Sequence, residues 1–134
     1  MTSINDPDVL AEVTAAVDAY EKALMTNDVE ALDGFFRDAA ETVRYGVAEN
    51  LYGFEAIAAF RIGRSGGSPR RSRLRTEITT FGRDFAVANV EFQREGAKRT
   101  GRQSQAWLRT ETGWKIVSAH VSLLQDGVDQ RLAP

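Results

Sequence analysis

The sequence predicts an α+β domain in which N-terminal helices pack in the concave face of a curved, mostly antiparallel sheet. Two observations support this prediction. Helical periodicity fills the first part of the chain, whereas the later part reads as strands separated by turn signals. In addition, 134 residues with 43% hydrophobic content suffice for one core of ordinary size. We therefore expect a single domain over residues 1–134, with room for a pocket between helices and sheet.

Three helices are predicted before the main sheet. Asp6 and Pro7 form a helix-start signal, because the carboxylate caps the first turn and proline needs no N–H donor there. Apolar residues then recur every three or four positions: Leu10, Val13, Val17, Tyr20 and Leu24. Asp28 is placed to cap a second, short helix over 29–36. A third helix is predicted over 53–64, where GFEAIAAFRIGR offers an apolar packing face.

The remaining segments read as strands and one long connection. Residues 42–53, TVRYGVAENLYG, predict a half-buried strand. Residues 61–75, RIGRSGGSPRRSRLR, hold six arginines with a Gly-Gly pair and a proline, so we expect a loop that is flexible near 63–73. Four further strands are predicted: LRTEITTFG, FAVANVEFQREG, RQSQAWLRT and WKIVSAHVSLL.

Composition excludes several classes of function. The formal charge of −2 and a pI near 5.5 give no overall electrostatic attraction for nucleic acid or an anionic membrane, and we expect neither partner. The absence of cysteine excludes disulfides, thiolate zinc sites and cysteine nucleophiles. With a single histidine, a two-histidine metal site is impossible, and we predict no functional metal. The sequence has neither a signal-peptide pattern nor a membrane-length apolar run, so a cytoplasmic protein is expected.

Arg44 and Tyr20 are the first candidates for function. A guanidinium inside a fold requires a fixed carboxylate or an anionic ligand, because arginine does not lose its charge. The structural alternatives for Arg44 are an ion pair with Glu41, Glu49 or Glu91, or exposure on the outer sheet face. Tyr20 lies on the apolar stripe, where its hydroxyl needs a partner; the alternative is a core tyrosine bonded to a backbone carbonyl.

The last strand contains the only histidine. Alternation along this strand places Trp114, Ile116, Ser118, His120 and Ser122 on one face. His120 with a neighbouring serine is the single candidate pair for a Ser-His site, but no G-x-S-x-G signature is present, which argues against serine hydrolysis. We therefore expect His120 and Ser122 in a pocket wall, with an orienting or proton-transfer role for the histidine.

Further polar candidates come from neighbouring segments. Gln103 and Trp107 share a face that suits either the wall of a polar ligand site or a dimer surface. Glu91 is a candidate partner of Arg44 or a second acid/base in the pocket. The arginine run that begins at Arg61 is either a solvated basic loop or a funnel for small anions, and it lacks the motifs of a phosphate-binding loop.

These elements, in this order, resemble the cone-shaped proteins of the nuclear transport factor 2-like superfamily, which includes ketosteroid isomerases, SnoaL-type polyketide cyclases and limonene epoxide hydrolases. The ending GWKIVSAHVS resembles the last strand of that superfamily. A closer similarity is to the AtzH- and HpxZ-like family of cyanuric acid and oxalurate catabolism. It rests on NDPDVLAEV, YEKALMTNDVEALDGFF, TVRYGVAENLYGFEAIAAFR, ITTFGRDFAVANVEF, GRQSQAW and GWKIVSAHVSLL, which cover most of residues 5–124.

The resemblance implies a homodimeric cone whose pocket holds Tyr20 and Arg44. It further implies a cofactor-free hydrolase-type activity, the decarboxylation of 1,3-dicarboxyurea to allophanate, or for HpxZ-like members a link to oxalurate breakdown. With Tyr20 and Arg44 as catalytic residues, the expected contacts to a small dicarboxylate substrate come from Arg61, Glu91, Gln103, Trp107, His120 and Ser122.

Two other functions stay open from sequence. One is a non-catalytic or accessory module that binds small anions, because this cone fold serves both enzymes and binding proteins. The other is a proton transfer like that of ketosteroid isomerase, which needs an apolar pocket and an acidic base. Glu91 and Asp38 are the candidates for such a base, and Arg44 argues against a steroid substrate.

Overall fold

A computed structural model describes residues 2–64 and 66–125, and these form three helices and six strands. The helices precede the long strands, as the sequence predicts. In chain order the elements are α1 (Pro7–Met25), α2 (Val29–Phe35), β1 (Val43–Tyr45), β2 (Asn50–Tyr52), α3 (Phe54–Gly63), β3 (Arg71–Phe81), β4 (Phe85–Arg94), β5 (Thr100–Thr110) and β6 (Gly113–Leu123).

Helix α1 begins as the sequence signal indicates. The Asp6 side chain accepts hydrogen bonds from the backbone N–H groups of Asp8 and Val9, and Pro7 occupies the first turn. One face of the helix is buried, formed by Val9, Val13, Val17, Tyr20 and Ala23. Leu10 and Leu24 lie half-buried at the margins of this face. The stripe therefore places Tyr20 toward the interior of the fold.

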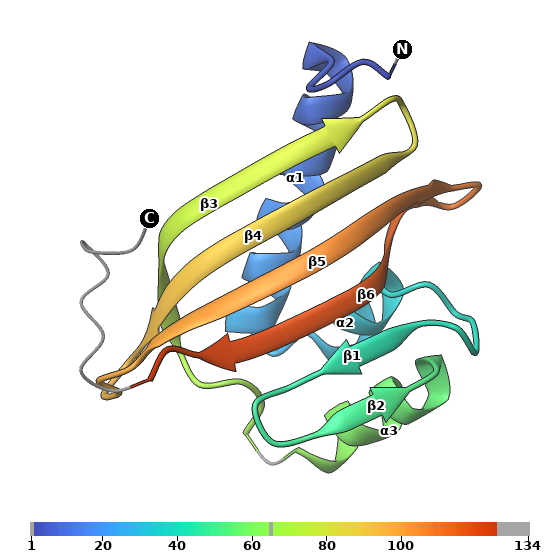
Figure 1. Cartoon of the computed structure of the whole chain (residues 1–134). Coiled ribbons are helices and arrows are strands. Elements are labelled where there is room, and N and C mark those ends of the chain that lie inside the picture. The colour runs from blue at the N-terminus through green and yellow to red at the C-terminus, as the bar shows by residue number, and fades with distance from the viewer. Residues whose placement is uncertain (1, 65, 126–134) are drawn as a thin grey trace.

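The sheet has the strand order β2-β1-β6-β5-β4-β3, and only the β1–β6 pair is parallel. Figure 1 shows the curved sheet with α1 and α2 on one face, while α3 lies beside β1 and β2 at one edge. The segment predicted as one strand over 42–53 is a short hairpin instead. Residues 46–49 form its turn, and the Gly46 N–H donates to the Glu49 carbonyl.

The alternation predicted along the last strand is wrong, and a β-bulge is the reason. Trp107 pairs with Ile116, whereas the preceding Ala106 pairs with Ser118, so Val117 has no partner of its own. A single extra residue reverses which face the following side chains occupy. Ile116 is buried on the helix-covered face, while His120 is exposed on the opposite, outer face.

The predicted arginine loop is shorter than expected. Arg61 belongs to α3, and β3 already begins at Arg71, so this strand contains Arg73 and Arg75. Each of these strand arginines has a carboxylate partner: Arg71 with Glu21, Arg73 with Asp18 and Arg75 with Glu77. Two of the partners come from α1, and these counter-ions make a basic strand compatible with packing against the helix.

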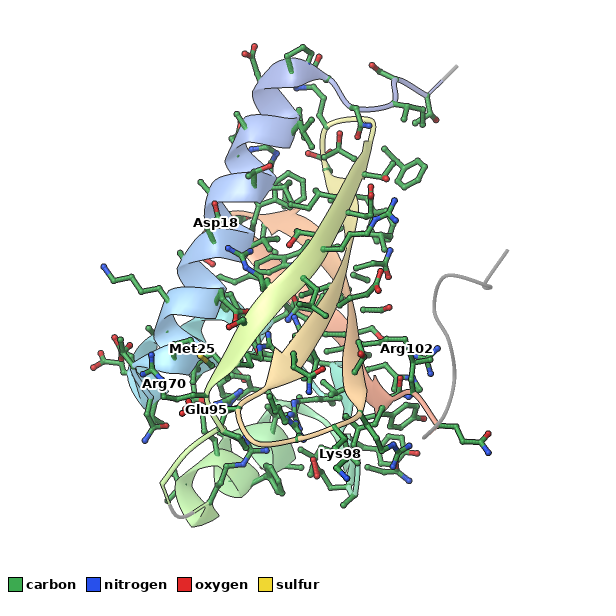
Figure 2. All side chains as sticks on the ribbon, turned by 90° about the vertical axis from the view of Figure 1, so that its left-hand side faces the viewer. Asp18, Met25, Arg70, Glu95, Lys98 and Arg102 are labelled. Atoms are coloured by element: carbon green, nitrogen blue, oxygen red, sulfur yellow. The ribbon has the colours of Figure 1, made fainter. Side chains whose placement is uncertain are left out.

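The core lies between the helices and the inner face of the sheet. Its largest members include Trp107, Ile57, Ile116 and Phe36. The outer face is polar and aromatic by contrast, and Figure 2 shows Arg102 on the side of the sheet away from α1.

In the described part of the chain, no helix is both long and apolar enough to cross a membrane.

Candidate functional site: an arginine-lined cavity

A cavity of about 320 Å³ opens at the end of the sheet where α1 finishes. It lies between the inner face of the sheet, the β1–β2 turn and the connection from α3 to β3. Its lining residues are Tyr20, Leu24, Arg44, Val47, Ala48, Glu49, Arg64, Gly67, Ser68, Pro69, Arg71, Arg94, Gln103 and Val121. A narrow extension of about 20 Å³ shares six of these residues, among them Tyr20 and Arg44, and reaches Phe60 and Arg61. We call this continuous site the arginine cavity.

Arg44 projects into the arginine cavity from β1 beside Glu49. Its Nη1 donates to Glu49 Oε1 at 3.5 Å, a long and therefore weak hydrogen bond. The two side chains are 13% and 19% exposed, so both are largely withdrawn from water. The Arg44 guanidinium also lies 5.8 Å from the centre of the Phe60 ring. The ion pair between Arg44 and Glu49, one of the alternatives considered from the sequence, is thus present. It uses one nitrogen of Arg44, so the other N–H donors can bind a ligand.

Arg71 is held more firmly than Arg44. It donates from Nε and Nη2 to the two carboxylate oxygens of Glu21, at 3.0 Å and 2.6 Å. A third bond runs from Nη2 to Oε1 of Gln103 at 3.1 Å. Its guanidinium is stacked 4.2 Å from the Phe92 ring centre. Such bidentate bonding fixes the plane of the guanidinium, so Arg71 forms a rigid wall of the cavity.

Arg64 and Arg94 have no carboxylate within salt-bridge distance among the described residues. Burial lowers the pKa of both guanidiniums, because desolvation disfavours the charged form. Neighbouring cations add to this effect, chiefly Arg44 beside Arg64 and Arg71 beside Arg94. The Nε atom of Arg94 is buried and has no hydrogen-bond partner in residues 2–64 and 66–125. Among the residues that the structure describes, no carboxylate forms an ion pair with either of these two cavity arginines.

Tyr20 and Arg61 meet at the inner end of the arginine cavity. Arg61 Nη1 donates to Asp33 Oδ1 at 3.2 Å, and its guanidinium lies 5.4 Å from the Phe36 ring centre. Burial lowers the pKa of Arg61, while Tyr20 and Asp33 act in the opposite direction. The Tyr20 ring is fixed by edge-to-face contacts with Phe35 and Phe36 at 5.8 Å and 6.2 Å. Packing thus holds the phenol in place beside a cation.

The charges of the arginine cavity do not balance. Five guanidiniums line it: Arg44, Arg61, Arg64, Arg71 and Arg94. Three carboxylates pair with members of this set: Glu49, Asp33 and Glu21. Within the described part of the chain, two positive charges therefore stay uncompensated in a partly desolvated space, which favours a ligand with two negative charges.

The structure brings together only part of the predicted site. Tyr20, Arg44, Arg61 and Gln103 all line the arginine cavity. Trp107 has 0% exposure and lies in the core, where its indole N–H donates to Gln105 Oε1 and its ring contacts Phe35. Trp107 therefore does not line the arginine cavity, where its predicted contact with substrate would have to form.

Three predicted substrate contacts lie outside the cavity. Glu91 lies on the outer face, opposite Arg75 and Arg102 in the strand register, because the alternation of β4 directs its neighbours Val90 and Phe92 inward. His120 and Ser122 occupy the same outer face as a result of the bulge at Val117. The His120 ring is stacked edge to face on Tyr45 at 5.5 Å.

The sequence predicted Arg64 and Arg71 only as members of a possible anion funnel, and it did not identify Arg94 at all. For Arg94 a signal was available, since it continues the inward alternation Val90, Phe92, Arg94 at the end of β4. For Arg71 the signal was Glu21, which follows Tyr20 on α1 and supplies a counter-ion. Among residues 2–64 and 66–125, no three His, Asp or Glu side chains gather in a way that could hold a metal ion.

Comparison with known proteins agrees with the fold. A protein of unknown function from Pectobacterium atrosepticum shares 52% identity over 91% of this chain and 95% of its own, with a TM-score of 0.88. A cystatin-like fold protein from Burkholderia xenovorans shares 47% identity over 92% and 98%, also with a TM-score of 0.88.

A nuclear transport factor 2-like superfamily protein from Salmonella enterica shares 25% identity over 92% of this chain and 96% of its own, with a TM-score of 0.73. No curated protein matches the chain. The AtzH-like family model matches residues 2–127. The fold is thus nuclear transport factor 2-like, as the sequence indicated, and the chain belongs to the AtzH-like family.

Proposed function

We propose that the protein is a cofactor-free enzyme of carboxylated urea catabolism, which removes one carboxylate from 1,3-dicarboxyurea and releases allophanate and CO₂. The observation that carries the proposal is the pair of uncompensated positive charges beside Tyr20 in the arginine cavity. Membership of the AtzH-like family supports the same assignment. The substrate is a small dianion with little apolar surface, so its binding energy must come from charge-assisted hydrogen bonds to guanidinium groups.

The reaction breaks the C–N bond between one urea nitrogen and its carboxylate carbon. The electron pair stays on that nitrogen, where it is delocalised into the urea carbonyl, and the carboxylate leaves as neutral CO₂. The nitrogen then takes up one proton, which gives the NH₂ group of allophanate. In the proposed step Tyr20, which lines the arginine cavity, donates its hydroxyl proton to the nitrogen or a hydrogen bond to the carbonyl oxygen. A proton that it gives up is regained from water.

The arginines contribute unequally to this reaction. The leaving carboxylate loses its charge, so a strong contact to it would stabilise the substrate more than the transition state. The carboxylate that stays and the urea oxygen keep or gain negative charge. Arg44 therefore accelerates the reaction when it holds one of these groups. Its weak bond to Glu49 leaves donors free for this purpose.

The alternatives are less consistent with the geometry. Glu91 lies on the outer face, and Asp38 lines an exposed groove near Lys115, so neither acid is placed as a base in the arginine cavity. This weakens the proposal of a ketosteroid-isomerase-like proton transfer. A non-catalytic anion-binding module would use the same arginines, and only turnover distinguishes it from an enzyme.

The test is turnover of 1,3-dicarboxyurea by the purified protein. Carbon-13 NMR would follow allophanate and CO₂, with the uncatalysed loss of CO₂ subtracted and oxalurate run in parallel. Enzyme-dependent formation of allophanate supports the proposal. Saturable binding of dicarboxylates without turnover would favour the binding module, and turnover of oxalurate alone would favour an HpxZ-like role.

A further inference from the structure

Four arginines that line the arginine cavity form two similar groups, each around one phenylalanine ring. In the first, Arg44 and Arg64 lie 5.8 Å and 4.9 Å from the centre of the Phe60 ring. This group comes from β1, α3 and the residue that follows α3. In the second, Arg71 and Arg94 lie 4.2 Å and 5.5 Å from the Phe92 ring centre. This group comes from β3 and β4.

Within the second group, the two arginines differ in their hydrogen bonding. Arg71 and Arg94 are directly opposite each other across the β3–β4 pair. Like charges in this position are destabilising unless other groups compensate them. Arg71 is compensated by Glu21 and Gln103, whereas the buried Nε of Arg94 has no partner. Arg94 thus adds a second positive charge to a cavity wall that another cation already occupies, and its Nε has no partner among the described residues.

A partly buried guanidinium without a counter-ion is costly, and a bound anion would reduce that cost. Both uncompensated arginines face the same cavity, one in each group. Glu49 lies within electrostatic reach of Arg64 and Arg94 and bonds Arg44, so one internal carboxylate is shared among three cations. This leaves one positive charge for a ligand at each wall.

We propose that Arg94 forms a second carboxylate-binding position, opposite the one formed by Arg44 and Arg64, so that the cavity binds a linear dianion by both ends. This inference deepens the proposed function by assigning the two substrate carboxylates to two walls, and it rests on that function for the identity of the substrate. Gln103 Oε1 accepts from Arg71 and thereby keeps that guanidinium directed along the same wall. Specificity for two carboxylates over one would come from Arg94.

The test compares a dicarboxylate with a monocarboxylate of equal carbon number, succinate and butyrate, by calorimetric titration. The parent protein should prefer succinate by about 10-fold or more, the effect of one hydrogen bond to a charged group. Arg94→Gln should abolish this preference while changing the affinity for butyrate by less than about 3-fold.

The matched control is Arg70→Gln, which removes the same charge near the same end of the molecule. Arg70 is exposed and its Nε lies 3.8 Å from Glu95 Oε2, and Figure 2 shows both residues near Met25 at the end of α1. This variant should keep the preference for succinate. Arg94→Lys provides a second test, because it retains the charge but lacks the Nε donor and the planar fork. It should show a reduced preference.

The inference fails if Arg94→Gln keeps the preference, or if it weakens both ligands equally, since the latter result means a general or structural effect. It also fails if the parent protein does not distinguish succinate from butyrate. Its failure is distinguishable from that of the proposed function. If selectivity depends on Arg94 but 1,3-dicarboxyurea is not turned over, only the proposed enzymatic function is wrong. If 1,3-dicarboxyurea is turned over without such selectivity, only the proposed second carboxylate-binding position is wrong.

Discussion

Glu49 returns across the β1–β2 turn to accept a hydrogen bond from Arg44 at 3.5 Å. Its carboxylate folds over Gly46, where a Cβ atom would collide with it. The glycine, the turn and the glutamate therefore form one local unit that supplies the cavity with an internal counter-ion. Because the bond to Arg44 is long, an entering carboxylate can displace or share this partner at little cost. The relationship explains why a glycine and a glutamate follow the arginine in RYGVAE.

Glu49→Gln should raise the affinity for small dicarboxylates. The substitution removes a negative charge that competes with the ligand for Arg44, Arg64 and Arg94, and an increase of about 3- to 10-fold is expected for a partly buried charge. Titration with succinate measures the change. Glu41→Gln is the control, since Glu41 is 79% exposed and pairs with Arg37. An unchanged or weaker affinity in Glu49→Gln would contradict the role of Glu49 as a competing carboxylate.

Gly46→Ala should reproduce the effect of Glu49→Gln without removing the charge from the protein. A methyl group at this position displaces the carboxylate from Arg44, and the flexible glutamate side chain can move, so a loss of about 1 kcal/mol or less in unfolding free energy is expected. Gly34→Ala, where no atom lies within 4 Å of the new Cβ, controls for the loss of a glycine. If the variant binds succinate with the affinity of the parent, the position of the Glu49 carboxylate beside Arg44 does not depend on a glycine at residue 46.

Arg94→Gln should unfold at the same temperature as the parent or higher when no ligand is present. Burial lowers the pKa of Arg94 in the folded state, so the charged form opposes folding at neutral pH. For a base with a lowered pKa, this penalty is complete below the folded-state pKa, shrinks as the pH rises above it, and is gone only above the unfolded-state pKa. Differential scanning fluorimetry checks the prediction. With saturating succinate, the parent should unfold at the higher temperature. If Arg94→Gln is less stable than the parent without ligand, Arg94 stabilises the fold through contacts within the protein, and the prediction is wrong.

The protein is predicted to be a homodimer through the outer face of the sheet. The face that motivated this prediction, with Gln103 and Trp107, is turned inward. The outer face carries other aromatic residues: Tyr45 and Tyr52 share a 3.2 Å contact between their hydroxyls, and Tyr52 is 63% exposed. Light scattering at micromolar concentration should give twice the mass of the chain. A monomer at that concentration would refute the prediction.

Local patterns predicted the parts of the site that depend on one element. The three-four spacing on α1 placed Tyr20 inside, and the charge of Arg44 in a half-buried strand indicated a ligand or counter-ion. Arg64 and Arg71 lie in one arginine-rich run, whereas Arg94 joins them only through the pairing of β3 with β4, so no single local pattern marks the three as one site. His120 was misplaced because a bulge depends on pairing with β5, which the sequence of β6 alone does not reveal.

The central claim is that Tyr20 assists bond breaking in the arginine cavity. Tyr20→Phe removes one hydroxyl and keeps the ring contacts with Phe35 and Phe36, so folding and dicarboxylate binding should survive. The most direct measurement is kcat of this variant on 1,3-dicarboxyurea, with the unfolding midpoint and succinate affinity determined on the same sample. We expect kcat to fall by about 100-fold or more while the other two values stay near those of the parent. A well-folded Tyr20→Phe variant with parental turnover would contradict the claim.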